Sequence, residues 1–159
     1  MSDLPDKAAL QAEMETTRAA YHELLSSLSQ EDWRRASGNP DMTVKDLMWH
    51  MAWAMGWLSG SVDAVKRGRR LWLPPILVDP LRALAMRWLA RNATQELAAR
   101  KYDEGYNALI DKLAGVIDGD WLRSARRFGE SRTVEWCFRQ PALHFEEHAA
   151  DVRPVLGRE

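Results

Sequence analysis

Apolar residues recur at helical spacing along most of the chain. In the segment 4–28 they fall three or four positions apart, which places them on one face of a helix. The members of this face are Leu10, Met14, Tyr21, Leu24, Leu25 and Leu28. The same pattern predicts three further long helices at about 44–67, 94–117 and 131–156, and no segment shows the alternation of a β-strand.

The local sequence marks where several of these helices begin and end. Thr43 and Asp46 have the spacing of a capping box, so a helix should begin at about Val44. Gly68 and Gly119 are expected to end the helices that precede them.

Prolines shape the rest of the pattern. Pro80 suits the first turn of a short helix at about 81–91. Pro141 removes the amide that would bond the Cys137 carbonyl, which predicts a kink or a restart of the last helix. Four long helices with connections of this size predict an all-α, antiparallel four-helix bundle with one short extra helix, forming a single domain over residues 1–159.

Two short segments resemble each other. Asp32-Trp33 precedes Thr43, and Asp120-Trp121 precedes Thr133. A histidine-bearing helix follows in both cases. This echo fits a bundle of two similar halves, and it also fits chance.

The charge balance excludes several classes of protein. The chain has 22 basic and 23 acidic residues, so no basic face for nucleic acid is expected. Two short basic runs, at 66–70 and 123–127, are interpreted as helix ends and solvated loops, with a phosphate-binding patch as the alternative. No apolar run reaches the length of a membrane span, and one cysteine allows no internal disulfide. We therefore expect a cytoplasmic protein without nucleic-acid or membrane partners.

Three of the four histidines form a candidate metal site. His144 and His148 are four residues apart and share a helix face, while His50 lies on the inward face of the helix at 44–67. Helical bundles build metal sites from facing helices, and three imidazoles leave coordination positions open, as in catalytic sites. The alternative is that these are hydrogen-bonded core residues. His22, beside Glu23, is interpreted as a surface or packing residue.

Tryptophans surround the candidate site in the sequence. Trp49, Trp53 and Trp57 recur every four residues, which fits core or dimer packing. It also fits an aromatic wall for a ligand, made of Trp53 and Trp57 beside the metal. The apolar segment 71–91 has three possible interpretations: a lid over the site, an oligomer contact, or a segment that attaches peripherally to a membrane. Cys137 is interpreted as a small buried hydrophobic residue.

The stretch from Met42 to Ala52, together with the H-x3-H-A-A-D-V pattern at residues 144–152, resembles the DinB/YfiT-like superfamily. Within it, the sequence is most similar to the metal-binding domain of mycothiol-dependent maleylpyruvate isomerases. The resemblance implies a four-helix bundle, often a homodimer, with His50, His144 and His148 as the metal ligands. His144 stands where the mycothiol group commonly has glutamate. Asp151 matches a recurring aspartate that would orient a ligand imidazole, or else it is a surface residue.

The resemblance also implies an activity. A divalent metal ion would bind a low-molecular-weight thiol, lower its pKa and present the thiolate to a small-molecule substrate, as in an S-transferase or isomerase. Hydrolysis through a metal-bound water is the nearest variant, and a non-catalytic metal- or ligand-binding bundle is the alternative. Zinc, nickel and iron(II) all accept imidazole. No catalytic base is evident, since helix phase points Glu146 and Glu147 away from the histidines. An Arg-Gly-Gln-like run common in DinB proteins is missing.

Overall fold

Helices make up most of the structure. The computed structural model describes residues 4–69, 84–127 and 129–156. Its four long helices are α1 (Lys7–Ser27), α2 (Val44–Lys66), α4 (Gln95–Ala114) and α6 (Val134–Val152). The shorter helical pieces are η1 (Asp32–Arg34), residues 84–90, α5 (Asp118–Trp121) and η2 (Arg153–Val155). The prediction of a mainly helical chain is confirmed, and none of the described helices has the length and apolarity needed to cross a membrane.

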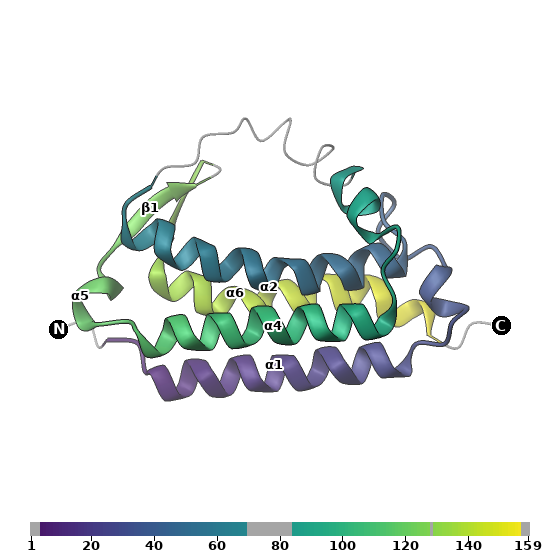
Figure 1. Cartoon of the computed structure of the whole chain (residues 1–159), viewed down its shortest axis with the longest axis horizontal. Coiled ribbons are helices and arrows are strands. Elements are labelled where there is room, and N and C mark those ends of the chain that lie inside the picture. Colours follow the sequence, from purple (N-terminus) through teal and green to yellow (C-terminus); the bar gives the residue numbers. More distant parts are fainter. Residues whose placement is uncertain (1–3, 70–83, 128, 157–159) are drawn as a thin grey trace.

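The four long helices lie side by side along the long axis of the molecule (Figure 1). α1 packs against α4 and α6, and α2 packs against the same two helices. The sequence pattern predicted an antiparallel bundle. In the structure, however, α2 and α4 pack together and run in the same direction (Figure 1). The long connection between residues 67 and 94 permits this, since it can return the chain to the end where α2 began.

Helix starts follow the sequence closely. Thr43 caps α2 by accepting a hydrogen bond from the Asp46 amide, and the Asp46 carboxylate accepts one from the Thr43 amide in return. Thr133 caps α6 in the same way, by accepting from the Trp136 amide. These caps satisfy amides that the first helical turn would leave without partners. They also set the helical phase of every residue that follows.

Helix ends follow the sequence less closely. Gly68 has a positive φ of 64° directly after α2, as predicted for a terminating glycine. Gly119 does not end α4, which stops at Ala114 with Gly115 as its cap. α6 continues through Pro141 without a restart, and that proline is buried. Burial of the apolar face of α6 therefore outweighs the loss of one backbone hydrogen bond at Pro141.

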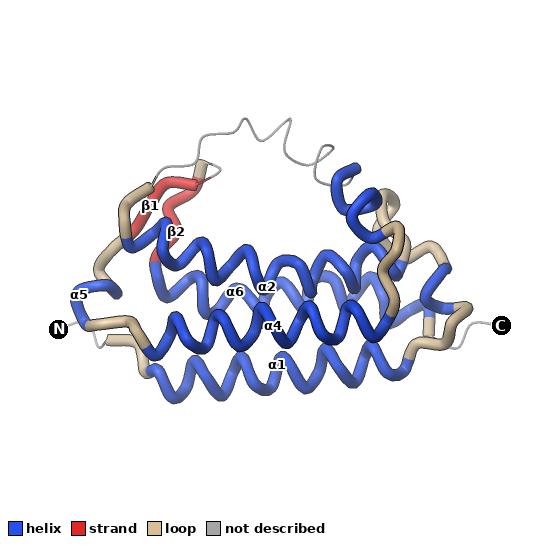
Figure 2. The backbone as a smooth tube through the Cα atoms, viewed as in Figure 1, coloured by secondary structure: helices blue, strands red, loops and turns tan. Residues whose placement is uncertain are grey.

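A β-hairpin precedes α6 (Figure 2), although the sequence pattern predicted no β-strand. Strands β1 (Ser124–Arg127) and β2 (Glu130–Thr133) pair antiparallel, with Ala125 opposite Arg132. Each strand has four residues, and Ala125 is buried against the bundle. Strands this short are too brief to show an alternating apolar pattern.

The two segments that resemble each other in sequence form the same turn. The carboxylates of Asp32 and Asp120 each accept a hydrogen bond from the amide three residues earlier, at 3.0 and 3.1 Å. The tryptophan that follows each aspartate, Trp33 or Trp121, is buried. The turn after α1 and the turn after α4 are therefore built alike, which favours two similar halves over chance.

α4 approaches α2 closely at Gly105. A Cβ atom on Gly105 would lie 2.5 Å from Met55 Cβ and 2.6 Å from the Gly56 backbone nitrogen. Contacts this short cannot be relieved by a side-chain rotation, because one of the atoms belongs to the backbone. Gly105 therefore sets the separation of these two helices.

We expect Gly105→Ala to lower the free energy of unfolding by about 1–3 kcal/mol, since the added methyl group must push α4 away from α2. Gly60→Ala is the matched control, because a Cβ there meets no described atom within 4 Å. Because alanine has a higher helix propensity than glycine, Gly60→Ala should stabilise the protein by up to about 1 kcal/mol. Urea unfolding of both variants tests this, and equal effects would contradict the close contact.

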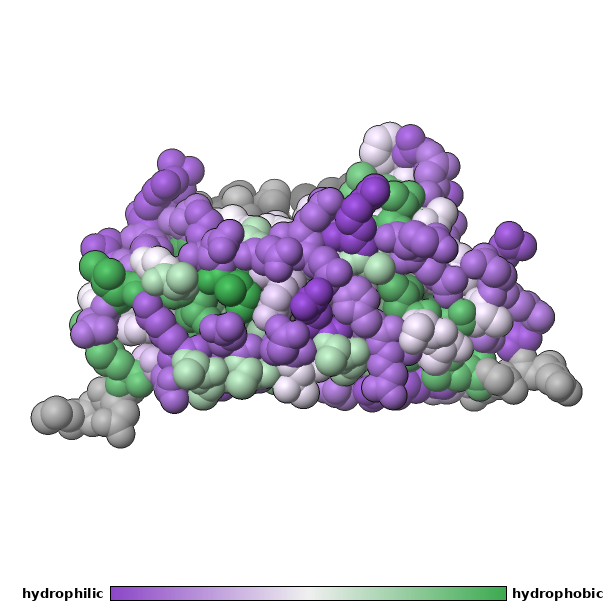
Figure 3. All heavy atoms as spheres, turned by 60° about the horizontal axis from the view of Figure 1, so that its bottom comes forward, coloured by the Kyte–Doolittle hydropathy of each residue, from purple (hydrophilic) through white to green (hydrophobic). Residues whose placement is uncertain are grey.

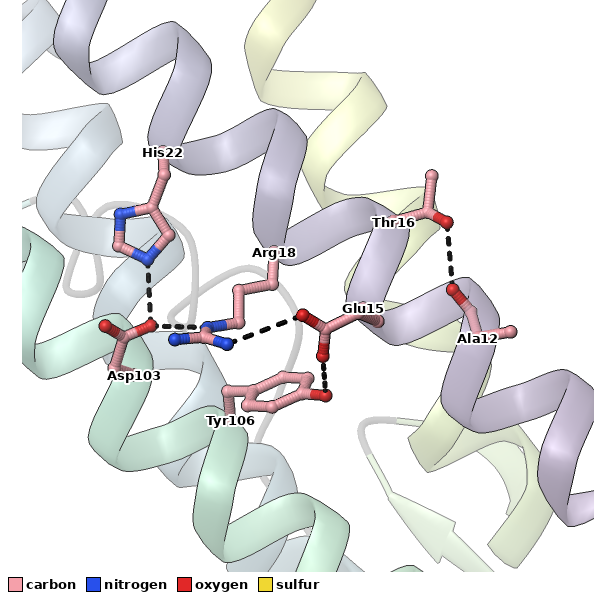
Figure 4. A network of polar contacts seen from close by, with 7 residues as sticks. All are labelled: Ala12, Glu15, Thr16, Arg18, His22, Asp103 and Tyr106. Carbon is pink, nitrogen blue, oxygen red and sulfur yellow. Dashed lines mark hydrogen bonds and ion pairs between the residues drawn. The ribbon is translucent and has the colours of Figure 1, made fainter.

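A polar network joins α1 to α4 (Figure 4). The Asp103 carboxylate lies 2.7 Å from Arg18 Nε and 2.8 Å from His22 Nε2. Glu15, one turn before Arg18, accepts a hydrogen bond from the Tyr106 hydroxyl. Hydrophilic side chains cover most of the α1 side of the molecule (Figure 3), so this network belongs to a solvated surface.

Partial burial by itself raises the pKa of Asp103, but the hydrogen bonds from Arg18 and His22 outweigh it and hold that pKa below its ordinary value. A carboxyl group with a lowered folded-state pKa stabilises the fold above its unfolded pKa of about 3.9. That stabilisation is lost as the pH falls through the lower folded-state pKa.

We therefore expect Asp103→Asn to lower the free energy of unfolding by about 1 kcal/mol at pH 7, a value reduced by solvent screening. The difference from wild type should shrink as the pH falls below about 4. Glu104→Gln serves as control, because Glu104 is exposed and lies 3.8 Å from Arg100. Urea unfolding across pH checks this, and a difference that stays constant with pH would refute it.

Candidate metal centre

Three histidines from two helices meet between α2 and α6. His50 is on α2 and is buried, with 5% of its surface exposed. His144 and His148 are half-buried and lie one turn apart on α6. α2 and α6 pack against each other and run in opposite directions (Figure 1), so the first half of α2 faces the second half of α6. The sequence prediction that these side chains come together is met in the structure.

The ring nitrogens are spaced as metal ligands would be. His144 Nε2 lies 3.0 Å from His50 Nε2 and 3.2 Å from His148 Nε2. The three ligand atoms all lie within 4.8 Å of one another. A tetrahedral ion with bonds of about 2.0–2.1 Å separates its nitrogen ligands by about 3.3 Å. The three side chains therefore fit a single divalent cation with little adjustment.

Hydrogen bonding among neutral imidazoles cannot account for both short contacts. Each Nε2 carries either one proton or one lone pair, directed outward in the plane of the ring. His144 Nε2 is therefore able to form one well-directed hydrogen bond, yet it meets two other Nε2 atoms. A cation at the centre would accept a lone pair from every ring and remove this conflict.

Core packing holds the part of α2 that carries His50. The Tyr21 hydroxyl on α1 donates a 3.0 Å hydrogen bond to the Met48 carbonyl, and the Tyr21 ring stacks on Tyr102 of α4 at 3.9 Å. Burial raises the pKa of Tyr21 well above its ordinary value, so the hydroxyl keeps the proton that it donates. Met48 and Met51, on either side of His50, are both buried.

The tryptophans of α2 are all half-buried. Trp49 and Trp57 pack against the hydrophobic core, as the packing interpretation expected. On α6, Trp136 also packs against the core, and the Arg132 guanidinium lies 4.0 Å from the centre of its ring. Sequence reasoning did not single out Trp136, which lies two turns before His144 on the same helix. The role of Trp53 and Trp57 as a pocket wall stays a prediction.

Asp151 lies where α6 meets the loop before α2. Its backbone carbonyl accepts a 2.8 Å hydrogen bond from the Gly38 amide. Its Oδ1 lies 3.0 Å from the position that a Cβ on Gly38 would take, so the loop approaches this residue closely. Asp151 therefore anchors the loop to the helix that carries His144 and His148, and its role in orienting an imidazole stays a prediction.

Other candidate residues lie apart from the histidine cluster. His22 contacts Asp103 between α1 and α4. Cys137 is fully buried, as expected for a small hydrophobic residue. Glu146 and Glu147 are exposed, which agrees with the helix phase, and Glu146 pairs with Arg153 at 3.2 Å.

The apolar segment 71–91 is described from residue 84 onward, and its residues 71–83 lie outside the described part of the chain. Met86 and Ala90 are buried, while Leu84 and Trp88 are largely exposed. The three interpretations of this segment therefore stay open.

Fold and site together define a helical protein with a candidate three-histidine metal centre between two packed helices. The model of the family described as Mycothiol maleylpyruvate isomerase N-terminal domain matches residues 14–153. The chain belongs to this DinB/YfiT-like family, as the sequence motifs indicated. No curated protein and no solved structure gives a significant match.

Proposed function

We propose that the chain binds one divalent metal ion through His50, His144 and His148 and is a thiol-dependent S-transferase or isomerase. The observation that carries the proposal is the convergence of three Nε2 atoms from two helices at 3.0 and 3.2 Å. The name of its family, which refers to mycothiol, supports a low-molecular-weight thiol as the second cofactor.

The protein supplies three neutral ligands, so a bound divalent ion would keep its full charge. Such an ion lowers the pKa of a coordinated thiol or water towards neutrality. His50 is buried, while His144 and His148 are half-buried. A thiol and an electrophile would therefore approach a bound ion from the side of α6, and α2 would cover the other side.

Several finer assignments accompany this proposal. The packing of four long helices supports a DinB/YfiT-type bundle. We also propose that two copies form a homodimer, which the resemblance to that superfamily implies. Trp53 and Trp57, at three and seven residues after His50, would face the small-molecule substrate. Asp151, one turn after His148, would hold an imidazole in position.

Purified without a histidine tag and loaded with zinc, nickel or iron(II), the wild-type protein should bind one ion per chain. His148→Ala should lose most of this metal, because two imidazoles leave the ion with too few protein ligands. His22→Ala is the matched control, because His22 contacts Asp103 between α1 and α4, away from the histidine cluster. This variant should bind as much metal as the wild type. Elemental analysis after dialysis measures the ratio. Equal, near-zero metal in all three proteins would reject the metal centre.

Metal binding should also depend on pH in a defined direction. Imidazole ligands must be neutral, so affinity should fall as the pH drops through about 6.5. At a free metal concentration 100 times the Kd, binding should stabilise the fold by about 2.7 kcal/mol at neutral pH. Thermal unfolding with and without metal, at pH 7.5 and pH 5, measures this. A metal-dependent gain that persists undiminished at pH 5 would point to carboxylate ligands instead.

A third experiment separates an enzyme from a binding protein. In metal-loaded wild type, the pKa of an added thiol such as mycothiol should fall from about 8.5 towards 7, and His148→Ala should not lower it. Thiolate absorbance measured against pH gives this pKa. Product formation from an electrophile by wild type alone would then establish catalysis. Full metal occupancy without thiol binding or turnover would favour the non-catalytic alternative.

A further inference from the structure

The two basic runs of the sequence meet at one end of the molecule. One run lies at the C-terminal end of α2, and the other leads into β1, which lies beside that end of α2 (Figure 1). The Arg123 guanidinium donates a 2.9 Å hydrogen bond to the Lys66 carbonyl and so joins the two runs directly. Residues nearly 60 positions apart in the sequence therefore share one surface.

A pocket of about 430 Å³ lies between them. Its lining residues are Gly68, Ser124, Ala125, Arg126, Gly129 and Ser131, and we call it the hairpin pocket. Its volume lies within the range of small-molecule sites, about 300–1,000 Å³.

The register of the hairpin explains the chemistry of this pocket. Arg126 stands opposite Ser131, and Ser124 lies two residues before Arg126, so all three occupy one face of the hairpin. Ala125 also borders the pocket, although its pairing with Arg132 places its side chain on the other face, where it is buried against the bundle. The hairpin pocket therefore receives two hydroxyl groups and one guanidinium group.

Two carboxylates near the pocket are paired with other cations. Asp120 pairs with Lys66 at 2.7 Å, and Glu130 pairs with Arg132 at 2.5 Å. Among the described residues that line the pocket none is acidic. Arg126 is exposed, and its Nε donates to the Gly129 carbonyl at 3.3 Å. No ion pair is found between Arg126 and a carboxylate in the described part of the chain.

We propose that the hairpin pocket binds a small oxyanion, such as a phosphate group, through Arg126 and the hydroxyls of Ser124 and Ser131. An arginine guanidinium forms charge-assisted and often bidentate hydrogen bonds with oxyanions. The two serine hydroxyls can each donate one further hydrogen bond to the anion. The ligand is either a free inorganic anion or the anionic end of a larger molecule, and both present the same chemistry to the pocket.

This site is separate from the histidine centre. His50 and Lys66 lie on the same helix, sixteen residues apart, which corresponds to about 24 Å along its axis. Anion binding should therefore proceed without metal, and failure of one proposal leaves the other intact.

The test is a titration of the metal-free protein with inorganic phosphate at constant ionic strength, followed by amide NMR shifts. The amides of Gly68, Gly129 and Ser131 should shift together and saturate. Arg126→Gln should weaken phosphate binding at least about fivefold, because it removes the charged donor. Ser131→Ala provides a second variant that keeps every charge and should also weaken binding. His148→Ala should bind phosphate as tightly as wild type.

Arg100→Gln is the matched control, since Arg100 is an exposed arginine of α4 whose carboxylate partner lies 3.8 Å away. It makes the same charge change and should leave phosphate affinity within about twofold of wild type, because screening weakens distant charges. Tighter binding of glycerol phosphate than of inorganic phosphate would identify the anionic end of a larger ligand, and equal binding would identify a free anion. Unsaturable shifts spread over the surface, equal losses in Arg126→Gln and Arg100→Gln, or loss of binding in His148→Ala would overturn the proposal.

Discussion

The packing of α2 against α6 is the constraint on which the candidate metal centre depends. Neither helix carries enough imidazoles to hold a metal ion, since α2 contributes one and α6 contributes two. The position of each ring is set twice, first by the threonine cap that starts its helix and then by the apolar face that the helix buries. A turn of either helix about its axis would separate the Nε2 atoms, so the geometry of the centre follows from the hydrophobic core.

The centre also depends on the core for support. Three imidazoles bring their Nε2 atoms together in partly apolar surroundings, an arrangement that a bound cation would stabilise. Core packing around His50, including the Tyr21 hydrogen bond to Met48, holds this part of α2 in place. Functional sites are often built in this way, with polar groups positioned by the packing of the surrounding structure.

The similar turns around Trp33 and Trp121 place the two candidate sites at opposite ends of α2. The turn after α1 leads into α2 close to His50, whereas the turn after α4 leads into the hairpin beside the end of α2. The first half has one antiparallel bridge before α2, between Ala36 and Thr43, and the second half extends the matching pair into the hairpin. The hairpin carries the hydroxyl and guanidinium groups of the hairpin pocket. The first half of the chain thus contributes the buried ligand and one basic run, and the second half contributes the remaining ligands and the other basic run.

Much of the local structure was determined by the sequence alone. Helical spacing and the Thr43–Asp46 capping box located α2, and the spacing of His144 and His148 placed both on one face of α6, because these features depend on neighbours within about one turn. The tertiary structure alone decided the rest. It brought His50 to His144, aligned α2 with α4, and joined two distant basic runs around the hairpin pocket. Packing likewise decided two local features. The four-residue strands of the hairpin have only weak β propensity, so their pairing depends on contacts with the rest of the fold. α6 continues through Pro141 because burial of its apolar face outweighs the helix-breaking tendency of a single proline.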